Sequence, residues 1–364
     1  MMMTPRENLL SLWRRNGYET VPVDFALSPA MVEKFLRNHP GHGDDYREFF
    51  SFPAREVRAN FLRQKETNWM RYYPGIEFLP ETTFSIWGTA HEKTPESMHM
   101  SRMYHPMKNF TSQEEFDAYP YPEFDETQME SCRKEVDAIH ARGLAASVCM
   151  ECTIWESAWY MRSMEEMMIG MMTDDPMTVS HLERITVLAE KRAAAFATAG
   201  VDFIRLGDDI GMQHTIMMSM ELYRAYLKPR LKRVIDAAKH VNPSLLITYH
   251  SCGYVTPFIE DLIDAGIDVL NPVQPECMDF KEIHDAYGDR LSFWGTLGTQ
   301  TTLPFGTPEE VRELVLRNLK IAGPKGGLLC TPTHLVEPEV PWENMEAYVE
   351  ACRFASENRN VISG

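Results

Sequence analysis

The feature that most limits the possible folds is a regular alternation that begins near residue 129. Short apolar runs lie at 144–150, 201–209, 245–253, 268–276, 291–299 and 326–335. Stretches of helical periodicity separate them at 130–143, 177–199, 219–240, 256–266, 280–289 and 307–323. Strands joined by helices require a parallel sheet, because each helix carries the chain back to the starting edge. The pattern therefore predicts an α/β fold.

The number of units favours a closed barrel. Six strands after residue 140, with 19–27 as an opening strand, give seven or eight βα units. No G-x-G-x-x-G or Walker loop follows any strand to favour a nucleotide-binding sheet. We therefore expect a TIM-type (β/α)8 barrel with an irregular N-terminal extension. Residues 1–364 would form one domain, with 1–128 as the irregular part that includes the first strand and 129–358 as the regular βα units.

Charge and composition exclude several classes of protein. The chain has 53 acidic against 36 basic side chains, a formal charge of −17, which argues against binding nucleic acid. No apolar run approaches the ~20 residues of a membrane span. The first residues are too polar for a signal peptide, and Thr4, Pro5 and Glu7 predict a capped helix. Seven cysteines do not form a secreted disulfide framework. We expect a cytoplasmic protein without membrane or nucleic-acid partners.

A candidate metal site follows the third predicted strand. His250 and Cys252 lie two residues apart, so at strand spacing they point the same way and can share a cation. The simpler alternative is a buried histidine beside a buried cysteine. A third ligand would come from the last strand, where Cys330 and His334 both lie. Three protein ligands and one open position are typical of catalytic zinc.

Other polar residues lie where predicted strands end. Asp208 and its neighbour Asp209 follow the second strand and could act as general base, metal ligand or helix cap. Glu156 stands among aromatic residues, where burial would raise its pKa. Methionines crowd 150–177 and 211–220, either as core filler or as an adaptable binding surface.

Four segments carry a resemblance to a known family. They are HSCGYVTPFIEDLIDAGIDVLNPVQPE (250–276), LSFWGTLGTQ (291–300), GTPEEVRELV (306–315) and VEPEVPWENMEAYVEA (336–351). Together they resemble the uroporphyrinogen decarboxylase superfamily over about 130–355, which implies a TIM-type barrel. The decarboxylase branch grips carboxylates with arginines after its first strand. Here the stretch VPVDFALSPAM (21–31) has none, which argues against a polycarboxylate substrate.

The other branch, the corrinoid-dependent methyltransferases, uses a zinc motif H-x-C…C. His250 and Cys252 match its first two ligands. Spacing favours Cys330 as the third, whereas alignment on VEPEVPWEN favours His334, which we prefer. The resemblance implies zinc, a corrinoid carried by a partner protein or bound transiently, and a small methylated substrate, including methoxylated aromatics, or a thiol.

The remaining expected roles belong to residues near these strand ends. We expect Glu156 and Asp208 to polarise or orient the substrate, and Trp155, Asn271 and Gln274 to bind it. A homodimer is left open. The alternatives are a decarboxylase and a non-catalytic binding barrel that kept the scaffold.

Overall fold

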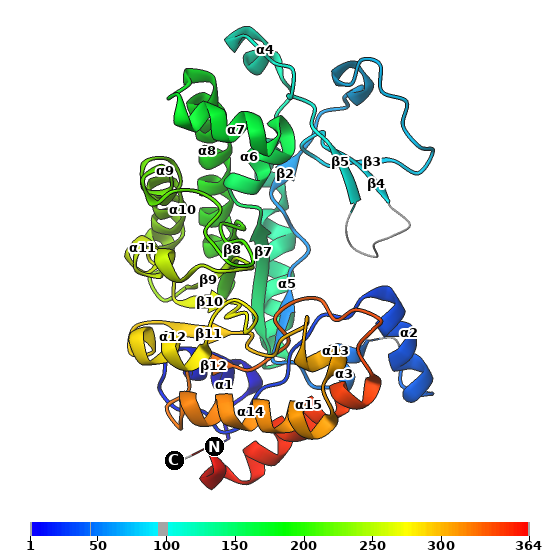
Figure 1. Ribbon diagram of the computed structural model, residues 1–364, viewed down its shortest axis with the longest axis vertical. Helices are drawn as coiled ribbons and strands as arrows, with labels where there is room; N and C mark the ends of the chain where they lie inside the picture. The colour runs from blue at the N-terminus through cyan, green and yellow to red at the C-terminus, as the bar shows by residue number, and fades with distance from the viewer. Residues whose placement is uncertain (1, 44, 94–100, 363–364) are drawn as a thin grey trace.

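A curled, parallel seven-stranded sheet forms the centre of the computed structural model, which describes residues 2–43, 45–93 and 101–362 (Figure 1). Its strand order is β1-β7-β8-β9-β10-β11-β12. The bounds are β1 (Ala54–Glu56), β7 (Ala145–Glu151), β8 (Phe203–Gly207), β9 (Leu246–His250), β10 (Val269–Asn271), β11 (Ser292–Trp294) and β12 (Leu328–Leu329). From β7 onward, spatial order follows chain order, which is the topology of a TIM-type barrel. The predicted α/β barrel is confirmed.

Helices follow the strands and cover the outside of the sheet (Figure 1). The longer ones are α5 (Met129–Ala141), α8 (Pro176–Ala199), α10 (Lys228–Val241), α11 (Ile259–Ala265), α12 (Phe280–Tyr287), α14 (Pro308–Ala322) and α15 (Trp342–Glu357). The remaining ones are α6 (Trp155–Arg162), α7 (Met164–Met172), α9 (Met220–Leu222), η3 (Tyr223–Leu227), η4 (Thr256–Phe258), α13 (Thr302–Phe305) and η5 (Arg359–Val361). Within the described ranges, no helix combines the length and apolarity needed to cross a bilayer.

The predicted opening strand at 19–27 is wrong in detail. Only Leu27 pairs, in one parallel bridge with Val336, and the sheet's first strand is β1 instead. The segment nevertheless lies against the barrel, because Val336 donates its backbone N–H to the carbonyl of Ala26 at 2.8 Å. On its other side, the Phe25 ring packs edge-on against Phe52, which lies just before β1. Residues 21–27 therefore lie between β12 and β1.

The N-terminal third is more ordered than the sequence predicted. Its helices are α1 (Pro5–Trp13), α2 (Pro29–Asn38), α3 (Tyr46–Phe49), η1 (Trp69–Tyr72), α4 (Gln113–Ala118) and η2 (Glu126–Gln128). Two small antiparallel sheets pair β2 (Leu62–Arg63) with β6 (Glu123–Phe124), and β3 (Thr83–Phe84), β4 (Ala90–Lys93) and β5 (Ser101–Tyr104) with one another. The three-stranded sheet projects away from the barrel (Figure 1). The predicted capping box of Thr4 and Glu7 is confirmed.

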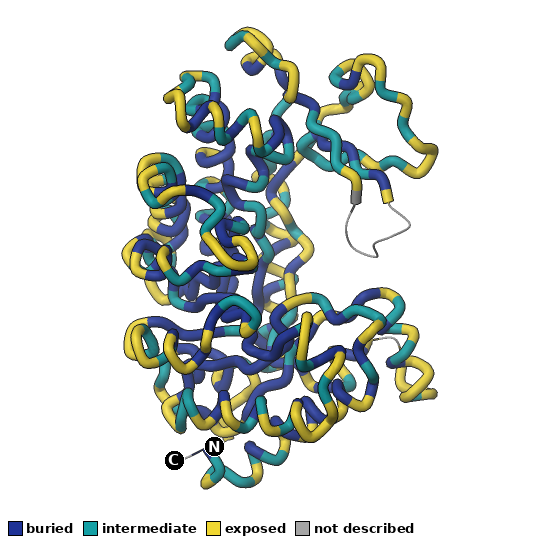
Figure 2. The backbone as a smooth tube through the Cα atoms, in the orientation of Figure 1, coloured by how far each residue is buried: buried dark blue, intermediate teal, exposed yellow. Residues whose placement is uncertain are grey.

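Aromatic packing closes the amino-terminal end of the barrel. Trp13, the last residue of α1, contacts Phe203 edge-on at 5.0 Å between ring centroids and Trp294 at 5.6 Å. Ser292, the first residue of β11, donates its hydroxyl to the Trp13 carbonyl at 2.6 Å. Residues in the interior of the barrel are buried, and residues at its periphery are exposed (Figure 2). Since this end is filled, a ligand must enter at the other end, where the strands finish.

The methionine crowding is mostly core. Met161, Met167 and Met171 are buried among the first helices after β7. Met172 and Met212 are exposed, with 74% and 51% of their surface accessible. The core interpretation therefore accounts for the buried members, while the exposed ones are available for contacts outside the barrel.

We predict that Asp202 carries much of the connection between α1, α5 and the sheet. Its buried carboxylate accepts hydrogen bonds from Arg6 at 2.7 Å and from the Ala146 N–H at 2.9 Å, and it lies 2.9 Å from His140 Nε2. Asp202→Ala leaves these partners unpaired, so the free energy of unfolding should fall by about 3 kcal/mol in urea denaturation. The control is Asp236→Ala, which removes an exposed pair with Lys232 and should cost less than about 0.5 kcal/mol. Equal losses for both variants would contradict this assignment.

Candidate metal centre

The candidate site lies where two neighbouring parallel strands end. β8 pairs with β9 so that Gly207 lies opposite His250. Parallel strands finish at the same edge of a sheet, so the residues that follow them emerge together. Asp209 follows β8 and Cys252 follows β9, which brings both to the open end of the barrel.

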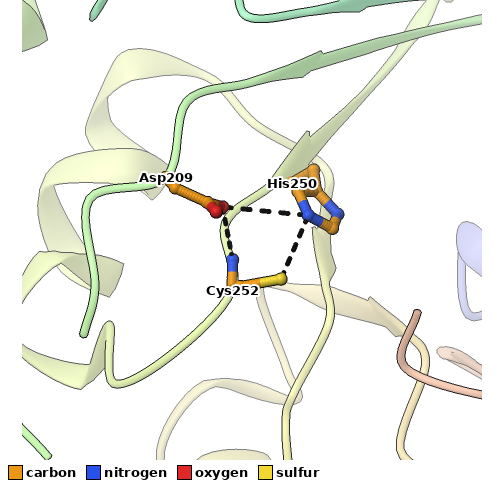
Figure 3. Close-up of side chains that lie close together, drawn as sticks. All are labelled: Asp209, His250 and Cys252. Carbon is orange, nitrogen blue, oxygen red and sulfur yellow. Dashed lines mark hydrogen bonds and ion pairs between the residues drawn. The ribbon is translucent and has the colours of Figure 1, made fainter. Parts of the chain in front are cut away.

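Three potential ligands meet at this edge. One ligand atom from each of Asp209, His250 and Cys252 lies within 4.8 Å of the others. His250 Nε2 is 3.4 Å from Cys252 Sγ and 3.8 Å from Asp209 Oδ1. The Asp209 carboxylate also accepts the Cys252 backbone N–H at 2.7 Å, which ties the two loops together (Figure 3). An imidazole, a thiol and a carboxylate thus face one point, as in a zinc site.

The electrostatic environment of His250 favours a bound cation. Burial lowers the pKa of His250, but the hydrogen bond to Cys252 and the charges of Cys252, Glu151 and Asp209 raise it further, to about 10. The nearby guanidinium of Arg205 is paired with Glu151 at 2.6 Å. A positive charge bound beside His250 is therefore stabilised by its anionic neighbours.

Asn271 orients the His250 ring. Asn271 Oδ1 lies 2.6 Å from His250 Nδ1, and Asn271 Nδ2 donates to the Trp294 carbonyl at 2.8 Å. Because the amide N–H is used by Trp294, its oxygen accepts from Nδ1–H, so the lone pair forms on Nε2 when the ring gives up a proton to a metal. The Nε2 lone pair thus faces Cys252 and Asp209, as metal ligation requires.

The loop after β9 is shaped by a second amide and a glycine. Gln274 Oε1 accepts the Gly253 backbone N–H at 3.0 Å. Gly253 has a φ of +84°, and a Cβ there would lie 2.7 Å from the Met212 carbonyl oxygen. The predicted substrate-binding roles of Asn271 and Gln274 stay predictions, since both border cavities, but each carbonyl oxygen is already used to position the site.

The structure separates the two candidates for a further ligand. His334 borders the same cavity of about 720 Å³ as His250, and an adjacent one of about 360 Å³ beside Cys252. The ring centroids of His334 and His250 are 6.3 Å apart. Cys330 borders neither cavity; it is fully buried, with its Sγ 3.5 Å from Thr296 Oγ1, and burial raises its pKa to about 11. The geometry favours His334 over Cys330.

Asp208 has a structural role, while its contact with substrate stays a prediction. Its buried carboxylate accepts the backbone N–H groups of Ile154 and Glu156, the latter at 2.9 Å. These are donors at the start of α6, so Asp208 caps that helix. Burial, followed by the charge of Glu156, raises the pKa of Asp208 well above its usual range. These hydrogen bonds support the capping alternative.

Trp155 and Glu156 lie behind the cluster. Trp155 is fully buried, with its Nε1 3.4 Å from Met217 Sδ, and it borders neither cavity, so its contact with substrate stays a prediction. Glu156 accepts the Tyr160 hydroxyl at 2.8 Å and the Asp209 backbone N–H at 3.1 Å. Burial, with the nearby Asp209 charge, raises the pKa of Glu156. In this structure Glu156 supports Asp209 from behind.

Asp209 is the functional residue that sequence reasoning passed over in favour of its neighbour. Side chains alternate along a strand, so Arg205, Gly207 and Asp209 share one face of β8. Arg205 borders the central cavity, which identifies that face as the inner one. The sequence therefore contained the signal: Arg205, a charged residue inside an otherwise apolar strand, marks the face of β8 that borders the cavity.

The cavity contains arginines that come from outside residues 21–31, and they are Arg47, Arg55, Arg58 and Arg205. Asp24, Asp45, Glu56 and Glu151 border the same cavity. Arg205 lies over the Trp294 ring at 5.0 Å while it pairs with Glu151. The stretch 21–31 has no arginine, but residues before, within and after β1 and on β8 bring arginines to the same space.

Fold and site define a TIM-barrel enzyme with a candidate metal centre at its strand ends. The chain belongs to the uroporphyrinogen decarboxylase (URO-D) family, whose model matches residues 105–354. Uroporphyrinogen decarboxylases of two Coxiella burnetii strains are each 25% identical over 186 residues, which is 50% of this chain and 49% of theirs. The match thus spans about half the length of these curated relatives.

A solved structure shares the whole fold. A methyltransferase from Methanosarcina mazei superposes with a TM-score of 0.65, covering 96% of this chain and 98% of its own, at 17% identity. At this identity the likeness concerns the fold. It agrees with the barrel topology described above.

We predict that Asn271 controls metal affinity without binding the metal. Asn271→Ala removes the acceptor that fixes the Nδ1 proton of His250, so zinc should bind about 10–100-fold more weakly. Competition titration against a chromophoric chelator measures this. As a control, Asn358→Ala at the end of α15 should leave the affinity unchanged. Unchanged zinc affinity in Asn271→Ala would show that the ring needs no such support.

Proposed function

We propose that this protein is a zinc-dependent methyltransferase that moves a methyl group between a small methylated substrate and a corrinoid protein. The observation that carries this proposal is the convergence of His250, Cys252 and Asp209 at the open end of the barrel, beside a cavity of about 720 Å³. Membership of the URO-D family supports an enzymatic role for this protein.

The donor set fits zinc. Nitrogen, sulfur and oxygen ligands together suit this borderline-soft ion, and the Nε2 lone pair of His250 is already directed at the thiol and carboxylate. His250, Cys252 and Asp209 would hold the ion, with His334 as a candidate fourth neighbour. Zinc bound there would polarise the methyl-bearing heteroatom or activate a thiol acceptor.

The chain's own residues provide binding and positioning. The cavity combines apolar surface from Phe203, Val148 and Trp294 with charged groups, which is typical of sites for small organic ligands. Asn271 and Gln274 hold His250 and the Gly253 loop in place. A cavity of this volume suits a small substrate rather than a corrinoid, so we infer that the corrinoid stays on its own protein and reaches the barrel mouth from outside.

A decarboxylase is the second candidate. The specific observation in its favour is the set of four arginines around the cavity, since arginine binds carboxylates in a two-pronged geometry. Three of these face competing carboxylates, because Arg205 pairs with Glu151, Arg55 with Glu48 and Arg58 with Glu135. Release of CO2 from uroporphyrinogen by the purified protein would favour this candidate over methyl transfer.

We predict that the purified protein holds about one zinc per chain and transfers methyl groups to free cob(I)alamin. The donors to test are methoxylated aromatics, methylamines and methylated thiols. His250→Ala and Cys252→Ser should lose both the zinc, measured by elemental analysis, and the transfer. Cys277→Ser, a half-buried cysteine outside the cluster, is the matched control and should retain both. Less than about half an equivalent of zinc, unchanged in His250→Ala, would favour a metal-free binding barrel.

We also predict which residue of the last barrel segment supports the metal. His334→Ala should weaken zinc binding by at least about tenfold, because the imidazole shares the cavity with His250. Cys330→Ala should leave zinc affinity within about twofold, because that thiol is buried beside Thr296. Chelator competition on both variants decides between them, and the opposite order would restore Cys330 as the ligand.

A further inference from the structure

Asp24 lies across the barrel from the candidate metal centre. Residues 21–27 fill the gap between β12 and β1, which makes an eight-membered ring with the seven strands. In that ring β9, which carries His250, is four places from this segment in either direction. Asp24 and His250 border the same cavity of about 720 Å³. A small substrate in this space therefore has the metal centre on one side and a carboxyl group on the other.

The Asp24 carboxyl is held without a direct ion pair. Among the described residues, no lysine, arginine or histidine nitrogen lies within 4.0 Å of its oxygens, whereas Arg205 is used by Glu151 and, at 4.0 Å, by Glu56. The backbone of Asp24 is fixed instead, because its N–H and carbonyl both contact the buried Tyr348 hydroxyl at 3.3 Å. The Asp24 backbone thus has a fixed place, and its carboxyl has no direct ion pair among the described residues.

The surroundings of Asp24 set its proton affinity. Burial raises its pKa to about 6, while the charges of Arg205, Arg47 and Arg55 and the Phe25 N–H lower it. The ionisable groups that face Asp24 are Arg205 on β8, Tyr46 and Arg47 on α3, Arg55 on β1 and Tyr348 on α15. A carboxylic acid with a pKa close to neutral pH can both hold and release a proton during turnover.

We propose that Asp24 is the general acid that protonates the oxygen from which the methyl group departs, so that the substrate is a methyl ether. This inference rests on the proposed methyl transfer. The carbon–oxygen bond breaks, its electron pair stays on oxygen, and the methyl group passes to the nucleophilic acceptor of the corrinoid partner. The Asp24 proton forms the new O–H bond, and solvent returns a proton to the carboxylate.

This role distinguishes ethers from other methyl donors. A methyl ether leaves a basic oxyanion, which a nearby acid stabilises by proton transfer. A quaternary ammonium or sulfonium donor leaves a neutral amine or thioether that needs no proton. Glu56 is another carboxylate that borders the cavity. It is exposed, and its ion pair with Arg205 is long, at 4.0 Å, so it serves as the comparison.

The first test compares leaving groups. Zinc-loaded wild type, Asp24→Asn and Glu56→Gln are assayed for methyl transfer to cob(I)alamin from methoxybenzene and from 4-nitromethoxybenzene. Asp24→Asn should lose about 10²-fold or more in kcat with methoxybenzene, and under about tenfold with the nitro compound, whose phenoxide is a better leaving group. Glu56→Gln should lose equally with both. Equal losses for the two ethers in Asp24→Asn, or the unequal pattern in Glu56→Gln, would overturn the proposal.

The second test needs no turnover. Since the folded-state pKa of Asp24 is raised, the wild type loses stability relative to Asp24→Asn as pH rises through that pKa. The Tm of Asp24→Asn minus that of wild type should therefore increase by about 2–4 °C between about pH 4.5 and pH 7.5. The exposed Asp236→Asn should show no such change. A flat difference for Asp24→Asn would show that this carboxyl holds no extra proton, which overturns the acid role.

The two tests separate the proposals. Wild type that transfers methyl groups only from quaternary ammonium or sulfonium donors retains the proposed function and overturns Asp24 as an acid. Wild type that transfers from no donor overturns the methyltransferase function, and the acid role with it, whatever the unfolding measurement shows.

Discussion

The parallel pairing of β8 with β9 is the constraint on which the site depends. Gly207 lies opposite His250, and a Cβ at position 207 would lie 2.6 Å from the His250 carbonyl oxygen. Only glycine permits this approach. Because the two strands end together, Asp209 and Cys252 emerge side by side, and the hydrogen bond between them fixes both loops. The metal centre is thus a consequence of strand register as much as of ligand identity.

Because side chains alternate along a strand, the neighbouring carboxylates of Asp208 and Asp209 lie in different surroundings. Asp209 faces the barrel interior and His250, whereas Asp208 points the other way and caps α6. Backbone donors compensate the burial of Asp208, so the hydrogen bonds of one carboxyl support the helix while the next remains available to a cation. Glu156 lies in the first turn of the capped helix and accepts the Asp209 backbone N–H, so it connects this helix to Asp209.

The cavity brings together groups of opposite character from distant parts of the chain. The metal centre lies at the ends of β8 and β9, while Asp24 and the arginines Arg47 and Arg55 come from the N-terminal part. Trp13 and Phe203 fill the other end of the barrel, so the candidate metal centre and Asp24 are reached from one entrance. This arrangement suits a reaction in which a bond is polarised from one side and a leaving group is protonated from the other.

Local patterns predicted the parts that depend on neighbours in sequence. Period-two and period-3.6 hydrophobicity predicted the six strands from β7 to β12 and the helices between them. The two-residue spacing of His250 and Cys252 predicted that they share a face. The strand at 19–27 was wrong, because this segment is held by one bridge to Val336 and by packing of Phe25 on Phe52 rather than by a ladder.

The sequence by itself determined the α/β barrel and the pairing of one histidine with one cysteine, because strand and helix periodicity are properties of adjacent residues. Only the tertiary structure decided that Asp209 rather than Asp208 joins them, that Asn271 orients His250, and that arginines and Asp24 enter the cavity. Those contacts join residues from 21 to more than 100 positions apart, for example Asn271 with His250 and Asp24 with Arg205. They exist only once strand order and register bring these residues to the same end of the barrel.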